Sequence, residues 1–457
     1  GSSAIIEYLS PNIAKPLHVG HLRNLILGDA LANIYESAGW DVTRWNYIGD
    51  WGTQFGKLIF AYRRWGDKEQ VEKNPISELT SLYVRFHQEA EYDKTLEEGA
   101  RLEFKKLETG DEENRTMWQW FKELSLKDMQ DLLNRVMASP FDVEQGEAFY
   151  ENDLDGVIAE VVSAGITKES EGALVIPLPD KELPAMIRKS DGASLYLTRD
   201  IANLKYRLKE FTPAEILYVI GNEQSLQFEQ FFTVAGMLGL DRQAQLFHIK
   251  YGLVLSADGK KFSTRKGDTV LASDILDEAE TRALKVVKEK RGDLEDFQQK
   301  EIAKDIALSA VKYAMLKDGR TTDISFDWDR MLDFHGDSGP YLLYTHARLR
   351  TMLSKSEDRC LESIPGGLLS EEELALIRQI AEFPSVIEAA RSEKSVNKIC
   401  LYLYELCNGA NAWYEGAPVI KDEDKVRRAA RLTLGEAIAD TLSRGLRILS
   451  IPTPERI

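Results

Sequence analysis

The sequence predicts an α/β protein with a doubly wound parallel sheet that is split by an insertion and followed by an all-α domain. In the first two thirds of the chain, apolar runs of strand length alternate with segments of helical periodicity, which is typical of a parallel sheet with helical crossovers. From Phe297 onward the apolar pattern is helical throughout. The length of 457 residues exceeds what one core usually accommodates, so we expect several domains.

The first half of the sheet is predicted in residues 4–62. Residues 4–9 (AIIEYL) form a short apolar run, followed by a proline-containing turn and a segment whose apolar residues recur three to four positions apart, as in a helix. Residues 40–47 (WDVTRWNY) predict a second strand, and a glycine-rich loop comes after it. Units of this kind hold anionic ligands between the end of the strand and the start of the helix.

Three further parts are predicted: an acidic, mostly helical insertion, the second half of the sheet, and the helical domain. They occupy residues 63–178, 179–296 and 297–457, respectively. Within the first two of these parts, strand patterns lie at residues 173–178, 215–220 and 246–254, and residues 141–153 (FDVEQGEAFYEND) predict a strand and a turn that holds Glu147. Residues 1–3 (GSS) are interpreted as a cloning remnant, because the chain does not start with Met.

Charge and composition narrow the possible partners. The formal net charge of −17 argues against a nonspecific nucleic-acid binder, because phosphate contacts need clustered cations. A specific RNA partner stays possible through local basic patches. Arg427, Arg428 and Arg431 form one candidate patch, with a solvated helix face as the alternative. No apolar run reaches the ~18 residues of a membrane span, so no membrane association is expected.

The cysteines favour a reducing environment. Cys360, Cys400 and Cys407 are odd in number and include no CxxC pair, so they support neither a disulfide framework nor a zinc site. We therefore expect a cytoplasmic protein without a metal site of its own.

Residues 10–23 (SPNIAKPLHVGHLR) form the strongest candidate site. His18 and His21 lie at the start of the first predicted helix, where an anion would bind. Gly20 allows a phosphate or a base to approach the backbone, and Lys15 adds a cation nearby. The combination predicts a nucleotide site, although two histidines three positions apart on a helix also commonly face solvent.

A second candidate lies in residues 256–270 (SADGKKFSTRKGDTV). Its cations, Lys260, Lys261, Arg265 and Lys266, lie among Gly, Ser and Thr residues. Such a loop suits a triphosphate whose negative charge is redistributed as pyrophosphate leaves. A solvated basic loop is the alternative.

The first candidate resembles the signature of one enzyme family. HVGH, residues 18–21, resembles the HIGH motif of class I aminoacyl-tRNA synthetases. The whole of residues 10–23 resembles the arginyl-tRNA synthetase version of that motif, which is far more specific than the tetrapeptide. The segment IGDWGTQFG, residues 48–56, resembles the segment after the second strand in the same family.

The second candidate resembles another motif of the same family. KFSTR, residues 261–265, resembles KMSKS, with Phe262 in place of Met and Arg265 in place of the second Lys. Arginyl-tRNA synthetases often carry a degenerate form of this motif, and their lysine at the position of Lys15 is thought to compensate. The departure therefore fits the family.

The resemblance covers nearly all of residues 5–457. It implies a Rossmann-like, HUP-type nucleotide-binding domain and a helical anticodon-binding domain. It also implies an arginine–tRNA ligase that converts L-arginine and ATP, with Mg²⁺, into arginyl-adenylate and pyrophosphate and then transfers arginine to the 3′ end of tRNA-Arg. ATP would be a substrate, and no tightly held metal or organic cofactor is expected. We expect a monomer that lacks the additional N-terminal domain usual in the family.

The resemblance also implies roles for individual residues. Adenylate formation needs positioning and positive charge rather than a protein nucleophile. The residues implied in catalysis are Lys15, His18, His21, Lys261 and Arg265. The residues implied in ATP binding are His18, Gly20, His21, Lys260, Lys261 and Ser263.

Arginine recognition calls for carboxylates, because a guanidinium is planar, always charged and best matched by bidentate acceptors. Lysine lacks the second set of donors, so strong discrimination against it is expected. The resemblance implies that the guanidinium contacts Glu147, Tyr196 and Asp200, that the α-amino group contacts Asn12 and Gln224, and that Glu7 lines the same pocket.

Two other functions stay open. One is an enzyme that adenylates arginine for an acceptor other than tRNA, against which the retained C-terminal helical domain argues. The other is a non-catalytic interaction protein of the same fold. Against it stand the intact side chains of Asn12, His18, His21, Asp200 and Gln224, which a lost activity would not require.

Overall fold

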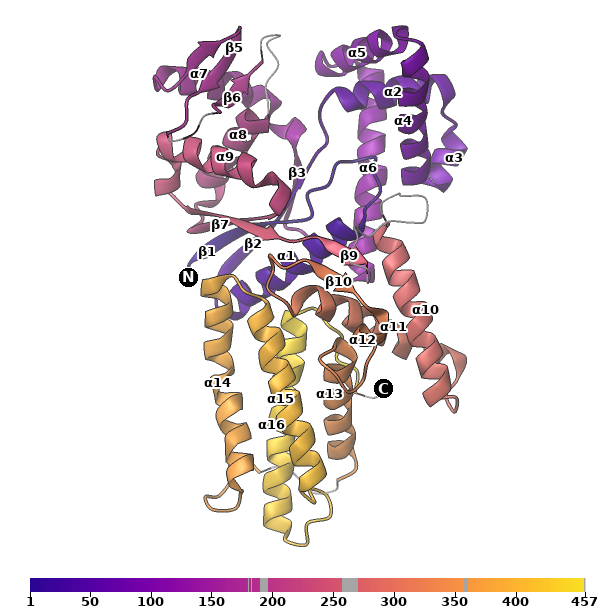
Figure 1. The fold of residues 1–457 in the computed structure, drawn as a ribbon, viewed down its shortest axis with the longest axis vertical. Coiled ribbons are helices and arrows are strands. Elements are labelled where there is room, and N and C mark those ends of the chain that lie inside the picture. Colours follow the sequence, from indigo (N-terminus) through magenta and orange to yellow (C-terminus); the bar gives the residue numbers. More distant parts are fainter. Residues whose placement is uncertain (180, 182, 190–195, 257–269, 357–360, 456) are drawn as a thin grey trace.

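The structure, a computed structural model, describes the chain except for residues 180, 182, 190–195, 257–269, 357–360 and 456. A central sheet carries two separate groups of elements above it in the view of Figure 1 and a column of helices below it. The N-terminus lies at the sheet, and the C-terminus lies beside the helical column.

The central sheet is entirely parallel, with the strand order β3-β2-β1-β7-β8. Its strands are β1 (Ser3–Glu7), β2 (Asp41–Ile48), β3 (Val143–Gly146), β7 (Glu215–Gly221) and β8 (Gln245–Tyr251). The chain extends the sheet from β1 to one side through β2 and β3, and later to the other side through β7 and β8. The prediction of a doubly wound parallel sheet is thereby confirmed. Its switch point, where such folds bind ligands, lies between β1 and β7.

Both faces of the sheet are buried, as is usual for parallel strands. Alternate residues of a strand enter different hydrophobic cores: Ile6 packs in the core that contains α1 (Val19–Ser37), whereas Ile5 packs in the core that contains α8 (Tyr196–Phe211) and α9 (Ser225–Met237). Continuous apolar runs such as residues 4–6 therefore form strands that are covered on both sides.

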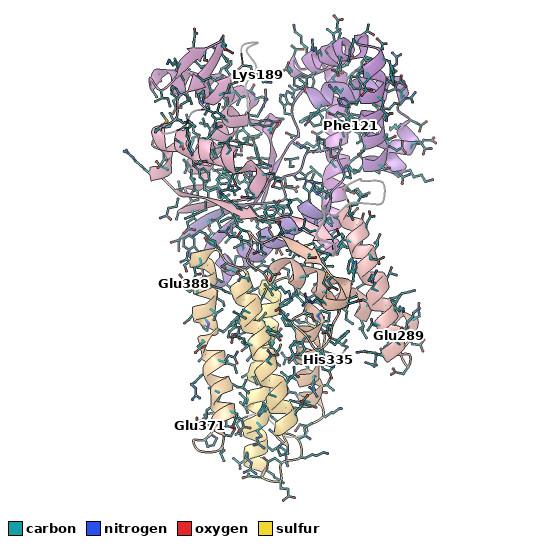
Figure 2. All side chains as sticks on the ribbon, viewed as in Figure 1. Phe121, Lys189, Glu289, His335, Glu371 and Glu388 are labelled. Atoms are coloured by element: carbon teal, nitrogen blue, oxygen red, sulfur yellow. The ribbon has the colours of Figure 1, made fainter. Side chains whose placement is uncertain are left out.

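A helical bundle comes after β2, at the upper right in Figure 1. Its helices are α2 (Thr53–Trp65), α3 (Lys68–Lys73), α4 (Pro75–Tyr92), α5 (Thr95–Glu108) and α6 (Glu112–Arg135). Phe121, which is labelled in Figure 2, is fully buried in this bundle and lies with its ring 5.6 Å from that of Tyr62.

A smaller group of elements comes after β3, at the upper left in Figure 1. It contains the short helix η1 (Glu147–Asp153) and α7 (Leu154–Ser163). It also contains an antiparallel sheet with the order β4-β5-β6, formed by β4 (Lys168–Ser170), β5 (Ala173–Ile176) and β6 (Ala185–Arg188). Of these strands, the sequence analysis predicts only β5.

The structure differs from the sequence analysis within the predicted insertion. β3 lies inside residues 63–178, yet it pairs with β2 as the edge strand of the central sheet. The strand itself is predicted from residues 141–153, but its place in the central sheet is not, because that pairing depends on contact with a strand about a hundred residues earlier. The domain boundaries stay a prediction.

The segment 246–254, predicted as one strand, forms two. The chain leaves the central sheet after β8, and β9 (Val254–Ser256) pairs in parallel with β10 (Ile324–Phe326). Gly252 lies at the break, where a Cβ atom would come within 2.8 Å of the Thr322 carbonyl oxygen. β10 is also an exception to the prediction that the chain is helical throughout from Phe297.

The remaining elements form the helical column. They are α10 (Ala272–Lys290), α11 (Asp296–Leu316), α12 (Trp328–Met331), α13 (Gly339–Ser354), α14 (Glu371–Glu393), α15 (Asn397–Gly416) and α16 (Lys425–Ile448). Figure 1 shows α13 to α16 side by side beneath the sheet, and all four contribute to one hydrophobic core. Among the described residues, no helix has the length and apolar character needed to cross a bilayer.

Candidate functional site

A cavity of about 360 Å³ lies at the switch point of the sheet, against the N-terminus of α1. Its walls come from the turn after β1, the start of α1, the segment after β7 and the connection from β8 to β9. Of the sequence-predicted residues, His18, Gly20, His21 and Gln224 line this cavity. The structure therefore brings the predicted nucleotide residues to the place where the topology expects a ligand.

The two histidines together form the cap of α1. His18 Nδ1 accepts a hydrogen bond from the Gly20 N–H at 3.0 Å, and His21 Nδ1 accepts one from the His18 N–H at 3.2 Å. The centroids of the two rings are 3.9 Å apart. Because each Nδ1 acts as an acceptor, the neutral rings carry their protons on Nε2.

The charge of His21 is determined by its surroundings. Burial, together with the nearby His18 and Lys15, lowers the pKa of His21 to about 3. His21 is therefore neutral at physiological pH, and it acts as a hydrogen-bond donor through Nε2 rather than as a cation. Gly20 is needed at its position, since a Cβ atom there would lie 2.9 Å from His18 Cε1 and would displace the capping ring.

Arg23 holds one wall of the cavity in place, a role that the sequence analysis does not predict. Its side chain lies in the second turn of α1, is buried, and donates to four backbone carbonyl oxygens at 2.6 to 3.0 Å. These carbonyls belong to Gly252, Leu253, Arg320 and Thr322. Arg23 thereby ties α1 to the β8–β9 connection and to the segment before β10.

Both ends of the predicted basic loop lie beside the cavity. β9 ends at Ser256, and on the other side of the loop Val270 and Ala272 pair with the residues around His18. The Val19 N–H donates to the Val270 carbonyl at 3.0 Å, and the Ala272 N–H donates to that of Leu17 at 2.9 Å. The predicted residues Lys260, Lys261, Ser263 and Arg265 lie outside the described part of the chain.

Two carboxyl groups with raised pKa values form a second part of the site. Burial raises the pKa of Glu147, at the start of η1, to about 8, and the positive charge of Arg199 only partly opposes this. Burial likewise raises the pKa of Asp200, on α8, to about 7. Asp200 accepts a hydrogen bond of 3.3 Å from Gln227, which lies on α9 three residues after Gln224. Neither carboxyl has an ion-pair partner among the described residues, so a bound cation would favour the ionised form of both.

Glu7 has a partner inside the protein. It is 4% exposed at the end of β1, and its Oε2 accepts a hydrogen bond from Nη2 of Arg207, on α8, whose side chain is fully buried. The sequence analysis places Glu7 in the arginine pocket but does not predict this ion pair. The sequence feature that could have indicated it is Arg207 itself, a charged residue on the buried side of the amphipathic helix α8.

The other predicted residues are exposed. Asn12, Lys15 and Tyr196 have exposed side chains, and that of Tyr196 is 63% exposed. Asn12 is held by backbone pairing with Gly49, where a Cβ atom would lie 2.1 Å from Asn12 Oδ1. Gly49 therefore has to be a glycine for Asn12 to keep its place, a requirement that the sequence analysis does not anticipate.

Asp50 connects three elements next to Glu147 and is also missed by the sequence analysis. Its side chain is fully buried; Oδ2 lies 2.7 Å from Nζ of Lys122 on α6, and Oδ1 accepts from the Ala148 N–H at 2.9 Å. Its carbonyl oxygen accepts from Trp118 at 2.7 Å. Asp50 thereby fixes η1, and with it Glu147, to the bundle.

The basic cluster predicted as a possible RNA surface has internal partners. Arg427 and Arg431 lie in the first turns of α16 and pair with Asp422 at 2.6 and 2.7 Å. Arg431 also pairs with the buried Glu373 at 2.7 Å. Arg428 donates to the Asp422 carbonyl oxygen at 2.6 Å. All three arginines therefore have partners within the protein and hold the loop before α16, and an RNA-facing role for this cluster stays a prediction.

Potential metal ligands do not gather into a site. Within the described part of the chain, no group of three or more His, Cys, Asp or Glu side chains is arranged to hold a metal ion. Cys400 and Cys407 are buried free thiols on α15.

Comparisons with known proteins agree with this geometry. A family model described as the catalytic domain of class I tRNA synthetases (R) matches residues 2–328, and one described as the DALR anticodon binding domain matches residues 342–457. An arginine–tRNA ligase of Clostridium botulinum (strain Alaska E43 / Type E3) is 40% identical over 458 residues, which cover 100% of this chain and 81% of that protein.

Solved structures give the same result. The arginyl-tRNA synthetase of Plasmodium falciparum superimposes with a TM-score of 0.84 at 26% identity, covering 100% of this chain and 77% of that one. The arginyl-tRNA synthetase of Thermus thermophilus superimposes with a TM-score of 0.83 at 26% identity, covering 100% and 83%. Two family models and a relative that matches the whole of this chain thus agree with a cavity capped by two histidines and with a pair of buried carboxyls, and the chain belongs to the class I arginyl-tRNA synthetase family.

Proposed function

We infer that this chain activates L-arginine with ATP and transfers it to tRNA-Arg. The comparison with full-length arginine–tRNA ligases supports the overall reaction. Within the structure, the observation that carries the inference is the pair of buried carboxyls, Glu147 and Asp200, which interact electrostatically and have no ion-pair partner among the described residues. A cationic amino acid would bind to this pair, and a nucleotide would bind in the histidine-capped cavity.

Activation requires no protein nucleophile. A carboxylate oxygen of arginine attacks the α-phosphorus of ATP, the bond from that phosphorus to the bridging oxygen breaks, and pyrophosphate leaves. We propose that the Nε2–H groups of His18 and His21 and the N-terminus of α1 stabilise the charge that develops on the phosphates. Because His21 is neutral, its contribution is an oriented hydrogen bond. In the second step a ribose hydroxyl of the tRNA 3′ end attacks the acyl carbon, and AMP leaves.

We propose that Asp200 and Glu147 accept the guanidinium of arginine, with Tyr196 beside them. A planar cation with two donating edges matches two carboxylates better than an ammonium does. Asn12 and Gln224 would contact the α-amino group. Their exposed side chains lie on opposite edges of the switch point, after β1 and before α9.

The remaining groups would act on the triphosphate. Lys15, Lys260, Lys261, Ser263 and Arg265 are proposed to bind it, the first from the turn before α1 and the others from the basic segment that begins and ends beside the cavity. Mg²⁺ would arrive with ATP and neutralise part of its charge. Glu223 lines the cavity and is the carboxylate available there, although it belongs to no metal-binding group among the described residues.

The test is charging of tRNA-Arg with labelled arginine, run beside arginine-dependent pyrophosphate exchange with and without tRNA. Charging is expected, and Asp200→Ala should abolish arginine use while the protein stays folded. Exchange without charging would instead indicate an adenylating enzyme with another acceptor. A folded protein with neither activity would indicate an interaction protein.

We also propose that the protein acts as a monomer in the cytoplasm. The site described above is built from one chain, and the free thiols of Cys400 and Cys407 suit a reducing compartment. Light scattering coupled to size-exclusion chromatography would show a mass near 51.8 kDa for a monomer and twice that for a dimer.

A further inference from the structure

Arg207 is a fully buried arginine on α8, the helix that also carries Asp200. It lies on α8 seven residues after Asp200, which places the two side chains on the same side of the helix about two turns apart. Its side chain is 0% exposed, whereas a buried arginine is rare unless it is paired. Because its side chain is buried, Arg207 contributes nothing to solubility or surface charge, and its role has to lie in its contacts inside the protein.

The contacts of Arg207 come from three neighbouring strands. Its Nη2 donates to Glu7, on β1. Its guanidinium carbon lies 4.4 Å from the centre of the Trp45 ring, on β2, and 5.5 Å from that of Tyr218, on β7. Nε and Nη1 have no hydrogen-bond acceptor among the described residues. The aromatic rings therefore supply the rest of the environment of the cation.

The carboxyl groups that act electrostatically on Glu147 or Asp200 include Glu7, Asp50 and Glu151, and each of these three has a cationic partner. Glu7 is paired with Arg207, Asp50 is paired with Lys122, and Glu151 is paired with Arg199 at 2.8 Å. Asp200 and Glu147 stay without a cationic partner in the described part of the chain. Internal pairing thus leaves two carboxyls for a ligand out of a larger acidic group.

Without its ion pair to Arg207, Glu7 would interfere with the binding of a cation to Asp200 and Glu147. Burial and the negative charge of Glu7 both raise the pKa of Asp200, whereas the charge of Arg207 lowers it. An unpaired carboxylate at Glu7 would therefore either take up a proton or compete with Asp200 for the incoming cation. The ion pair prevents both.

We propose that Arg207 is a positioning residue for arginine recognition. Its ion pair with Glu7 keeps that carboxylate from binding the substrate, so the guanidinium of the substrate binds to Asp200 and Glu147 instead. This inference rests on the proposed function, since it assumes that arginine is the ligand. It deepens that function by giving Glu7 an indirect role and by adding a residue that touches no substrate.

The test uses equilibrium binding of L-arginine and of a non-hydrolysable ATP analogue, measured by calorimetry at pH 8. The variants are Arg207→Met, Arg207→Lys and the double variant Glu7→Gln/Arg207→Met. Lys205→Met is the matched control, because Lys205 is a cation on the same helix that pairs with Glu160 away from the site. Circular dichroism and urea unfolding verify the fold of each variant.

Arg207→Met is expected to weaken arginine binding by about tenfold to a hundredfold, the range for weakening one charged hydrogen bond between the bound guanidinium and Asp200 or Glu147. Binding of the ATP analogue should change by less than about twofold. Arg207→Lys should lie between Arg207→Met and the native protein, since it keeps the charge but loses the planar contact with Trp45.

The double variant separates positioning from simple structural support. If Arg207 acts by occupying Glu7, removing both charges should recover most of the lost arginine affinity. If the double variant binds arginine as weakly as Arg207→Met, or if Arg207→Met binds arginine like the native protein, the proposal is wrong. An equal loss of arginine and ATP-analogue binding would also overturn it in favour of a structural role.

Two further results keep the test decisive. Should Arg207→Met fail to fold, the arginine affinities of Arg207→Lys and of the double variant are compared instead. Both should fold, because Arg207→Lys keeps a cation beside Glu7 and the double variant has no carboxylate at that position. Failure of the native protein to bind arginine would overturn the proposed function itself. Native binding with no effect of the variants would overturn only the role of Arg207.

Discussion

At the scale of single residues, the site holds two carboxyls that burial keeps partly protonated near neutral pH. Glu147 and Asp200 have pKa values of about 8 and about 7, well above the ordinary values of 4.5 and 3.8. A guanidinium bound between them would favour their ionised forms. Arginine binding and proton release are therefore linked, and the direction of the linkage can be tested.

Arginine should bind more weakly as the pH falls from 8.5 to 6.5, because protons on Glu147 and Asp200 must leave before the cation binds. Each displaced proton changes the dissociation constant by up to about tenfold per pH unit. Calorimetry at several pH values, in two buffers with different ionisation enthalpies, measures both the affinity and the protons released. Glu147→Gln should remove the step near pH 8. Native affinity that is constant over this range would contradict the linkage.

Gly49→Ala is expected to weaken arginine binding while leaving ATP binding intact. The new Cβ would overlap Asn12 Oδ1, 2.1 Å away, and would push that side chain from the position proposed for the α-amino group. We expect an increase in the KM for arginine of roughly tenfold, the effect of one displaced polar contact. Pyrophosphate exchange measures the KM values for arginine and ATP separately.

The matched control for this variant is Gly156→Ala. Gly156 lies in α7, where a Cβ would meet no atom within 4 Å, so its substitution should leave both KM values unchanged. Equal effects of the two substitutions would show that Gly49 acts through general stability rather than through Asn12.

At the scale of elements, α1 organises the site more than any other helix. Its first turn carries the histidine cap, its second turn carries Arg23, and its residues face the sheet on one side and the helical column on the other. Arg23 links α1 to two segments more than 200 residues away in sequence. The shape of the cavity therefore depends on this one side chain.

Arg23→Met should destabilise the protein by at least about 3 kcal/mol, because four carbonyl oxygens lose their donor in a buried place. It should also raise the KM for ATP more than that for arginine, since the β8–β9 connection lines the nucleotide cavity. Urea unfolding and pyrophosphate exchange measure the two effects. Arg64→Met, on the exposed side of α2, is the control. An Arg23→Met protein as stable as this control would contradict the assigned role.

At the scale of the whole molecule, α1 and the end of α16 join the sheet to the helical column. Asn33 donates to the Ile448 carbonyl oxygen at 3.0 Å, and Ser450 donates to Asp29 at 2.5 Å. Lys312, on α11, donates to the Ser450 carbonyl at 2.8 Å. This joint is partly buried and polar, so the two parts should unfold together.

Lys312 gives the joint a pH dependence. Burial lowers its pKa from 10.5 to about 8, so between these values the unfolded chain binds a proton that the folded chain does not. The contribution of Lys312 to the free energy of unfolding therefore increases as the pH rises from 8 to 10.5. The difference in unfolding free energy between the native protein and Lys312→Met should grow by up to about 3 kcal/mol over this range. Urea unfolding at pH 7.5 and pH 10 measures the difference. An equal difference at both values would mean that Lys312 does not titrate in this way.

The sequence by itself determined the elements with strong local signals. Apolar runs and helical periodicity located β1, β2, β7 and the helical column, because burial on both faces leaves a continuous apolar run in a strand. The motif at residues 10–23 located the cavity, because the turn, the glycine and the histidines are adjacent in the chain. Its resemblance to the family motif supplied the function.

Only the tertiary structure decided the features that depend on distant contacts. β10 is too short to show a pattern, and the place of β3 in the central sheet follows only from its pairing with β2, as that of β10 follows from its pairing with β9. The ion pair of Glu7 with Arg207 joins residues 200 positions apart, and Arg427 and Arg431 of α16 pair with Asp422 and Glu373. Charge is visible in a sequence, but whether a charge meets a partner or stays available to a ligand depends on which elements the fold brings together.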